Sequence, residues 1–282
     1  MQHPKMNGNA RRPQSLIFTL FGDYIRHRND RVWIGALVKI LALFDLSEPA
    51  VRSTVSRMAR RGWLKNERVK NISYYQITPR AHQVIADGAQ KIFQFPEQTE
   101  NWDGCWHLVT YSIPEERRAA RDHFRAELSW LGYGMLTNTV WISPWNRRAR
   151  VECLAADLNI KSNVQLFDGQ IEAFVSCQEL VARCWNLDAM NIEYANFIAT
   201  YASALKNFEA RLNSRAAIDA SEFFVRRFML MHEFRRFPYR DPQLPAELLP
   251  RDWRGAEASA LFHKYHDLLA DGANKYFDSV FR

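Results

Sequence analysis

Arginine and serine side chains recur along residues 52–61 at a spacing that places them on one side of a helix. The members of this set are Arg52, Ser53, Ser56, Arg57, Arg60 and Arg61. A guanidinium group can pair bidentately with guanine or bind a phosphate, and a serine hydroxyl can reach either partner. A helix in the major groove of DNA presents its N-terminal residues to base edges. We therefore expect Arg52 to contact a base and the later arginines to contact phosphates.

Three more basic residues follow in a segment that we expect to form a hairpin. They are Lys65, Arg68 and Lys70. Such a hairpin can lie against the phosphates or the minor groove beside the site of the basic helix. A solvated basic surface without a nucleic-acid partner is the alternative. RNA is less favoured, because readers of single strands stack bases on aromatic side chains of a sheet, and one of the adjacent Tyr74 and Tyr75 must face the core.

Residue types that catalyse reactions or bind metals show no suitable arrangement in the sequence. His263 and His266 lie three residues apart, but two histidines are too few ligands for a metal site. The sequence HEFRR at residues 232–236 differs from the HExxH motif of zinc proteases. Cys105 and His107 would share one strand face, where simple burial is favoured over a reactive thiol. We find no Ser-His-Asp or Cys-His pattern, and we predict no catalytic residue, no metal site and no cofactor.

The elements around the basic helix must hold it at the surface of a small core. Val51, Val55, Met58 and Ala59 form its opposite, buried stripe. The expected elements are a helix over 15–26 begun by Ser15, a helix over 34–44, a turn at 45–47, the basic helix from Ser47 to about Arg61 before Gly62, strands at 63–65 and 72–77 joined by the loop NERVKN, and a helix over 78–93 begun by Thr78 and Pro79. This order is that of a winged helix-turn-helix.

The remainder of the chain predicts an α+β region followed by helices. The expected elements are a strand within 102–114, a helix over 115–131, a strand within 135–144, a helix over 147–158, a strand or strand pair within 163–174, and helices over 187–212, 214–236 and 255–281, with a proline-rich bend at 237–250. The βαββαβ-like order indicates a ferredoxin-like domain. We thus expect an arm at 1–14, a DNA-binding domain at 15–94, a ferredoxin-like domain at 95–179 and a helical domain at 180–282.

The charge of the chain is concentrated in its first third. Residues 1–100 hold 16 lysines and arginines and 8 acidic residues, whereas residues 101–282 hold 22 and 23, for a net charge of +7 overall. This asymmetry suggests a nucleic acid or an anionic membrane surface as the partner of that third alone. No apolar run is long enough to span a membrane, and the N-terminus lacks the apolar stretch of a signal peptide. The four cysteines form no CxxC motif, so free thiols in a reducing cytoplasm are expected, with no membrane partner.

Four segments together resemble a known family. They are SLIFTLFGDYIR, WIGALVKILALFDLSEPAVRSTVSRMARRGWL, WHLVTYSIPEERRAARDHFRAELSWLGYGMLTNTVWISP and LMHEFRRFPYRDPQLPAELLPRDWRGAEASALF. In this combination and order they are similar to the repressors of phenylacetic acid degradation operons, the PaaX-type transcriptional regulators. The resemblance implies a winged helix, a ferredoxin-like domain and a helical C-terminal domain. It also implies a homodimer that leaves its double-stranded operator DNA when it binds an aryl-CoA, typically phenylacetyl-CoA.

A thioester of coenzyme A needs cations for its phosphates and an apolar slot for its acyl group. The segment RRFMLMHEFRRFPYRDP supplies both residue types, and we expect effector contacts from His232, Arg235, Arg236, Tyr239 and Arg240. Two purely structural roles stay open for the same residues. Basic side chains at a helix end also suit the helix dipole, and Arg240 can simply pair with Asp241.

Two hypotheses from different classes follow. The first is a homodimeric repressor on a two-fold symmetric site, because one winged helix buries too little surface for tight binding. The second is a metal-dependent nuclease or RNA-processing enzyme on the ferredoxin-like domain, which would need converging carboxylates. Asp103, Asp122 and Asp157 are the candidates, and their expected positions do not converge. A purely architectural DNA-binding protein would not need the helical C-terminal third.

Overall fold

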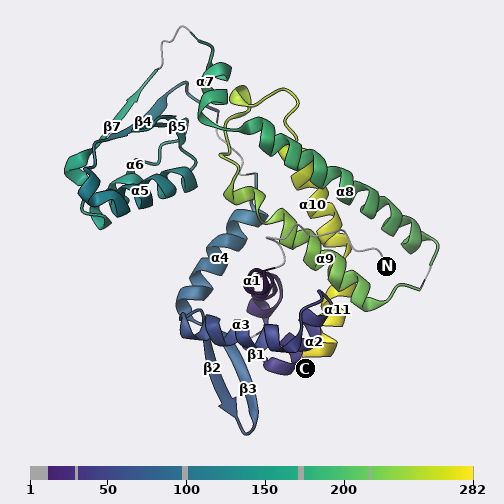
Figure 1. The fold of residues 1–282 in the computed structure, drawn as a ribbon. Helices are drawn as coiled ribbons and strands as arrows, with labels where there is room; N and C mark the ends of the chain where they lie inside the picture. The colour runs from purple at the N-terminus through teal and green to yellow at the C-terminus, as the bar shows by residue number, and fades with distance from the viewer. Residues whose placement is uncertain (1–11, 29–30, 97–100, 171–174, 216, 282) are drawn as a thin grey trace. The chain divides into compact units, whose positions relative to one another are not determined.

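The computed structural model describes residues 12–28, 31–96, 101–170, 175–215 and 217–281. Figure 1 shows these residues as helices with two small antiparallel sheets. The chain divides into two compact units: residues 1–95, 196–236 and 257–282 form the first, and residues 96–195 and 237–256 form the second. The C-terminal third therefore contributes to both units. This division reflects which segments pack together, and it does not test which segments fold independently. The three consecutive domains expected from the sequence therefore remain a prediction.

The described residues of the N-terminal part of the first unit form four α-helices, a short 3₁₀ helix at Ile25–His27 and a three-stranded sheet. Its elements are α1 (Pro13–Asp23), β1 (Arg31–Trp33), α2 (Ile34–Ala42), α3 (Glu48–Arg60), β2 (Leu64–Val69), β3 (Ile72–Ile77) and α4 (Pro79–Phe93). Most of the predicted arm lies outside the described residues. Pro13 begins α1, so Ser15 is not its N-cap as predicted: the fixed backbone angle of proline suits the first helical turn. Thr78 does cap α4, because its hydroxyl accepts a hydrogen bond from the backbone N–H of Ala81.

The hairpin of β2 and β3 is longer than the sequence predicted. Val69 and Ile72 are its last paired residues, so the turn contains only Lys70 and Asn71. Lys70 has a φ of 54°, which a two-residue turn between twisted strands favours. The predicted loop NERVKN is therefore wrong over residues 66–69, which extend β2. Strand β1, which was not predicted, pairs with β3 and makes the order β1-β3-β2.

One hydrophobic core joins the N-terminal helices to two C-terminal helices. Helix α9 (Ala220–Phe234) contributes Phe224 and Phe228, and helix α11 (Ala270–Phe281) contributes Phe277. These rings pack with the buried faces of α1, α2 and α3, where Tyr24 and Phe44 meet them directly. The first unit also contains α10 (Gly255–Leu268), which together with α11 replaces the single final helix that was predicted.

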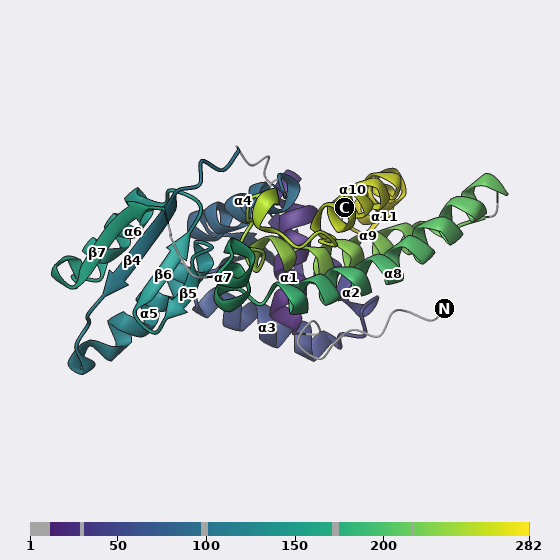
Figure 2. The same cartoon turned by 90° about the horizontal axis from the view of Figure 1, so that it is seen from above.

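The second unit is built on a four-stranded antiparallel sheet. Its elements are β4 (Trp106–Tyr111), α5 (Arg118–Trp130), β5 (Gly134–Thr137), β6 (Val140–Ser143), α6 (Arg148–Asp157), β7 (Val164–Gly169), α7 (Cys177–Cys184) and the first part of α8 (Leu187–Asn213). The strand order is β5-β6-β4-β7, and Figure 2 shows these strands side by side. The strand predicted within 135–144 is two strands, because the Thr137 hydroxyl accepts hydrogen bonds from the backbone of Thr139 and Val140 and turns the chain.

The two faces of this sheet are covered differently. Helices α5 and α6 pack Phe124 and Val151 against the face that carries Val109 and Tyr111. Helix α7 and the short helix Ala246–Leu248 of the proline-rich bend cover part of the other face, where Trp106 lies. The polar network described below lies where β4 begins and where β6 and β7 end. Among the residues that the structure describes, no helix is both long and apolar enough to cross a bilayer.

Candidate nucleic-acid interface

Helix α3 presents a basic and hydroxylated face to solvent. Every residue predicted to contact DNA on the helix is exposed, as are the three on the hairpin: Arg52, Ser53, Ser56, Arg57, Arg60, Arg61, Lys65, Arg68 and Lys70. The opposite stripe contains Val51, Val55 and Met58, all fully buried, and also Thr54, which the sequence pattern did not select. Ala59 is only partly buried. The spacing of apolar residues thus identified the outward side of this helix.

The turn before α3 and the glycine after it fix where the helix begins and ends. Asp45 has a φ of 61°, a left-handed conformation that Asp adopts more readily than most residues. Ser47 stands at the N-cap position directly before Glu48, as predicted, although its side chain makes no capping hydrogen bond. Gly62 has a φ of 74° directly after the last turn. The N–H of Trp63 then bonds to the carbonyl of Met58, which closes the helix end.

Two arginines of the outward face make side-chain contacts within the helix: Arg57 donates to the buried Thr54 hydroxyl at 3.3 Å, and Arg52 pairs with Glu48. The Arg52 guanidinium donates to the Glu48 carboxylate at 2.7 Å, and both side chains are about half exposed. An exposed i, i+4 pair is worth only a few tenths of a kcal/mol, roughly 0.3–0.5. Arg52 also lies near Tyr75: burial raises the pKa of Tyr75, and the charge of Arg52 opposes that rise. Arg52 can therefore exchange its present partner for another anion at little cost.

The pairing register divides the basic residues of the hairpin between two faces. Arg68 is paired with Ser73, and both lie on the same face of the hairpin as Tyr75, which is buried at the end nearer the core. Lys65 is paired with Gln76 on the opposite face. That opposite face also carries the Arg31–Glu67 ion pair of 3.6 Å and the Arg31 guanidinium over the Tyr74 ring. Arg68, and not Lys65, thus continues the side of the hairpin next to Arg52.

The residues predicted to bind an effector belong to different compact units. His232, Arg235 and Arg236 lie in the first unit, and Tyr239 and Arg240 lie in the second. The second unit uses Arg240 in a two-pronged ion pair with Glu193, where both guanidinium nitrogens donate to the carboxylate. The alternative partner Asp241 instead accepts a hydrogen bond from the buried Tyr194. Arg236 and Tyr239 are exposed.

Two of the predicted effector residues hold helix α1 instead of facing solvent. His232 Nδ1 lies 2.7 Å from the Thr19 hydroxyl, in a buried hydrogen bond. Arg235 donates to the Ser15 hydroxyl at 2.6 Å. Sequence spacing could not reveal these contacts, because more than two hundred residues separate the partners. The C-terminal helix α9 is therefore bonded directly to the first helix of the chain.

A third contact completes this line of polar bonds, which we call the α1–α9 seam: Ser15, Thr19 and Asp23 on one side, and Arg235, His232 and Arg227 on the other. Arg227 Nη1 donates to Asp23 at 2.9 Å, and His266 Nε2 from α10 lies 3.4 Å from the same carboxylate. All three side chains are buried. Burial alone would raise the pKa of Asp23, but its contact with His266 and the charge of Arg227 lower it below the ordinary value. Asp23 is thus ionised in the folded protein.

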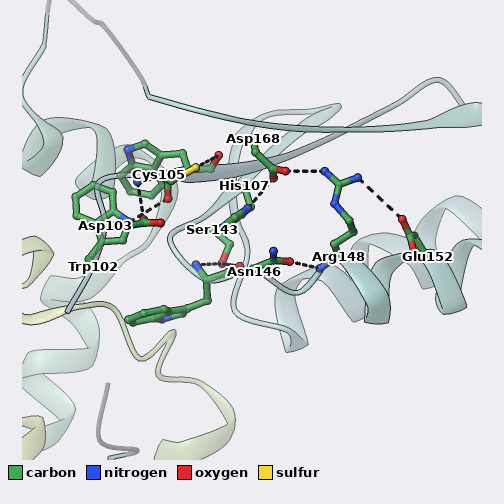
Figure 3. A network of polar contacts seen from close by, with 11 residues as sticks. Trp102, Asp103, Cys105, His107, Ser143, Asn146, Arg148, Glu152 and Asp168 are labelled. Carbon is green, nitrogen blue, oxygen red and sulfur yellow. Dashed lines mark hydrogen bonds and ion pairs between the residues drawn. The ribbon is translucent and has the colours of Figure 1, made fainter. Parts of the chain in front are cut away.

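The second unit contains a serine, a histidine and an aspartate on three neighbouring strands. Ser143 on β6, His107 on β4 and Asp168 on β7 are direct cross-strand partners, which sequence spacing did not reveal. His107 Nδ1 lies 2.7 Å from Asp168, whose second oxygen accepts from Arg148, and Figure 3 shows both contacts. The Ser143 hydroxyl, however, bonds to the backbone of Trp145. Ser143 is buried, and its hydroxyl bonds to the nearby backbone and not to His107. These residues therefore do not form a catalytic triad.

Two of the three candidate nuclease carboxylates have structural partners. Asp103 accepts a hydrogen bond from the backbone N–H of Cys105, as Figure 3 shows, and Asp122 lies 3.7 Å from Arg118. Asp157 ends α6. Within the described part of the chain, no group of three or more histidine, cysteine or acidic side chains is arranged to hold a metal ion. The described residues therefore supply no two-metal site.

Comparisons with known proteins agree along nearly the whole chain. A family model described as PaaX-like protein matches residues 12–81, the PaaX protein central Cas2-like domain matches residues 99–181, and the PaaX-like protein C-terminal domain matches residues 185–279. The transcriptional repressor PaaX of Escherichia coli K12 is 30% identical over 265 residues, which are 92% of this chain and 81% of the relative. The chain belongs to the PaaX family. The resemblance drawn from the four sequence segments is thereby confirmed.

Membership of the PaaX family favours one of the two hypotheses. The E. coli relative is a transcriptional repressor and not an enzyme, so a PaaX-type repressor role is supported over a nuclease. A solved structure of an uncharacterized protein from Mycobacterium tuberculosis has the same fold, with a TM-score of 0.60 over 96% of this chain and 99% of that chain. At 22% identity, that likeness extends to the fold alone.

Proposed function

We propose that this protein is a transcriptional repressor that binds double-stranded operator DNA through α3 and the β2–β3 hairpin. Helices α2 and α3 with the hairpin follow the order of a winged helix-turn-helix. The sheet order β5-β6-β4-β7 with α5 and α6 on one face is that of a ferredoxin-like domain. The observation that carries the proposal is the outward face of α3, where six basic or hydroxylated side chains are exposed and weakly held.

Arg52 and Arg60 provide the test of this interface. Arg52 stands in the second turn of α3 beside Tyr75, where it would meet a base, whereas Arg60 ends the helix, where it would meet a phosphate. Arg52→Ala should lower affinity for a selected duplex by about 1–3 kcal/mol and relax preference at one base pair. Arg60→Ala should weaken binding to all sequences alike and reduce the salt slope by about one. Equal binding by both variants and the parent would refute the assignment.

The repressor acts as a homodimer in this proposal. One recognition helix and one hairpin bury less surface than tight, specific binding requires, and two copies on a two-fold symmetric site double it. The half-site centres should be spaced by about one or two helical turns of DNA. Light scattering of the complex with a selected duplex measures the stoichiometry. A single chain per site would contradict the dimer.

An aryl-CoA, with phenylacetyl-CoA as the first candidate, is the proposed effector. Arg236, Tyr239 and Arg240 are exposed and can meet the phosphates of the coenzyme. His232 and Arg235 instead hold α1, so a ligand that shifts this segment would also shift the helix beneath the DNA-binding face. Such a ligand releases DNA only if it binds the DNA-incompetent arrangement more tightly.

A titration of aryl-CoA thioesters and free aromatic acids against a labelled duplex tests the effector. We expect a thioester to weaken DNA binding at least tenfold, which corresponds to about 1.4 kcal/mol of coupling. Free phenylacetate should do little, because it lacks the phosphates. Arg240→Ala should weaken the response to the thioester, whereas binding of DNA by the unliganded protein should stay unchanged. Release by a free acid but by no thioester would exclude the coenzyme and keep the repressor.

A further inference from the structure

The outer face of the three-stranded sheet carries a strip of apolar and aromatic side chains. We call it the outer strip, and its members are Trp33, Val69, Ile72 and Tyr74. Trp33 is the cross-strand partner of Tyr74. Val69 is the partner of Ile72, two residues nearer the turn, so the pairing register places both pairs on one face. The opposite face is the one on which Tyr75 is buried toward the core. Figure 1 shows this sheet, with β2 and β3 projecting as a ribbon.

The outer strip is open to solvent, and its indole ring is already held in place. Val69 is 39% exposed and Ile72 is 45% exposed, and the two aromatic side chains are partly exposed. A Cβ added at Gly35 would lie 1.7 Å from the Trp33 ring, so the ring occupies the space that this glycine leaves on α2. A ring that is fixed in advance loses little conformational entropy when a partner covers it.

Cations border the outer strip. The Lys39 Nζ atom lies 5.7 Å from the centre of the indole ring, and the Arg31 guanidinium carbon lies 4.2 Å from the centre of the phenol ring. Lys65 is exposed on the same face of the sheet. The acidic residue of this face, Glu67, lies 3.6 Å from Arg31, so three cations stand against one carboxylate. A partner with carboxylates beside its apolar side chains complements this border.

The position and the charge of the outer strip disfavour two other occupants. In the proposed complex with DNA, the duplex lies on the other side of the hairpin, where Arg68 continues the face next to Arg52. A second copy packed strip against strip would bring the cations of both copies together, and such juxtaposed like charges cost free energy. Neither objection applies to an acidic segment of a different protein.

We propose that the outer strip is a docking site for an acidic segment of another protein. The aromatic row and the aliphatic row of the strip are two residues apart along the strands, or about 7 Å. Residues four apart on one side of a helix have Cβ atoms about 5–6 Å apart, so a short amphipathic helix can place one apolar side chain on each row. Aspartates or glutamates beside these anchors then reach Lys39 and Lys65. Such a segment can stay bound while α3 holds DNA. The proposal thus adds a protein partner to the proposed function.

Peptides selected from a random displayed library against the immobilised full chain provide the probe. We expect the enriched sequences to contain two apolar residues three or four positions apart, with aspartate or glutamate beside them. Val69→Ser with Ile72→Ser should weaken binding of a labelled enriched peptide about tenfold. Lys39→Ala should weaken it about threefold and reduce its salt dependence. Val84→Ser on α4 is the control, because Val84 is also β-branched and 50% exposed, and it should bind the peptide as the parent does.

Arg60→Ala distinguishes the outer strip from the basic face of α3, which can also attract an acidic peptide. This variant should bind the peptide as the parent does, and a loss of binding would place the peptide on α3 and overturn the proposal. Equal binding by the double variant and the parent, enriched sequences without acidic residues, or no enrichment would also overturn it. So would a loss of dimer mass in the double variant, which would make the strip a contact between copies. None of these measurements uses DNA, so they stand whether or not the protein selects an operator.

Discussion

Asp23→Ala removes the carboxylate that faces Arg227 in the α1–α9 seam. The Arg227 side chain is 9% exposed and donates to Asp23 at 2.9 Å, so the substitution leaves a guanidinium without its counter-charge in a nearly dry site. Breaking a buried ion pair by removing one partner costs about 3–5 kcal/mol of unfolding free energy. The Tyr24 ring, which lies 5.1 Å from the guanidinium carbon, offsets only a small part of this loss.

A matched control separates burial from the mere presence of an ion pair. Arg28 and Asp278 also join the N-terminal segment to a C-terminal helix, but Asp278 is 44% exposed. Asp278→Ala should therefore cost no more than about 1 kcal/mol. In urea unfolding followed by circular dichroism, with a slope of about 2–3 kcal/mol per molar, the midpoint should fall by about 1–2 M for Asp23→Ala. Equal shifts for the two variants would refute the argument from burial.

The pH dependence provides a second check on the same substitution. The pKa of Asp23 is lower in the folded protein than in the unfolded chain, where a value of about 3.9 applies. Its contribution to stability is therefore fully present above about pH 4 and is lost as the pH falls through the folded-state pKa. The difference between parent and variant should shrink in acid. A difference that stays constant down to the lowest pH at which the parent folds would assign the loss to packing and not to charge.

Three further substitutions test local features. Ser176→Ala should lower stability by about 1 kcal/mol in thermal unfolding, because it removes the capping box that Ser176 forms with Glu179 at the start of α7. Gly132→Ala should cost more than Gly104→Ala: both glycines have positive φ, but only at Gly132 would an added Cβ lie 3.3 Å from the Pro242 carbonyl oxygen. Thr19→Val should cost about 1–3 kcal/mol in thermal unfolding, because the shape is kept while the buried hydrogen bond between Thr19 and His232 Nδ1 is lost; an unchanged melting curve would contradict this.

Sequence patterns correctly predicted the features that depend on interactions between residues close together in the sequence. The apolar stripe of α3, the glycine after it and the Thr78 cap of α4 all follow from neighbours within a few residues, and the structure confirms them. Strand β1 was missed because three residues are too few to show an alternating pattern. The turn at Lys70 was misplaced because neither turn residue is glycine, the usual signal of a tight hairpin.

Long-range contacts account for the remaining differences. His232 and Arg235 have the residue types of a phosphate site, but their partners Thr19 and Ser15 lie at the other end of the sequence. In the same way, Ser143, His107 and Asp168 have no recognisable spacing, and the sheet register brings them together. The composition of residues 226–240 indicated a phosphate-binding site. The fold shows that some of these polar side chains instead form hydrogen bonds between helices.

The shared core of the first unit has a consequence for synthesis of the chain on the ribosome. The faces of α1 and α2 that meet Phe224, Phe228 and Phe277 have no cover until those residues are made. At about 5–20 residues per second, the roughly 190 residues from the end of α4 to the end of α11 take about 10–40 s to synthesise. During that interval the basic segment is present without its full core. The packing that supports α3 is therefore complete only after the C-terminal helices have emerged.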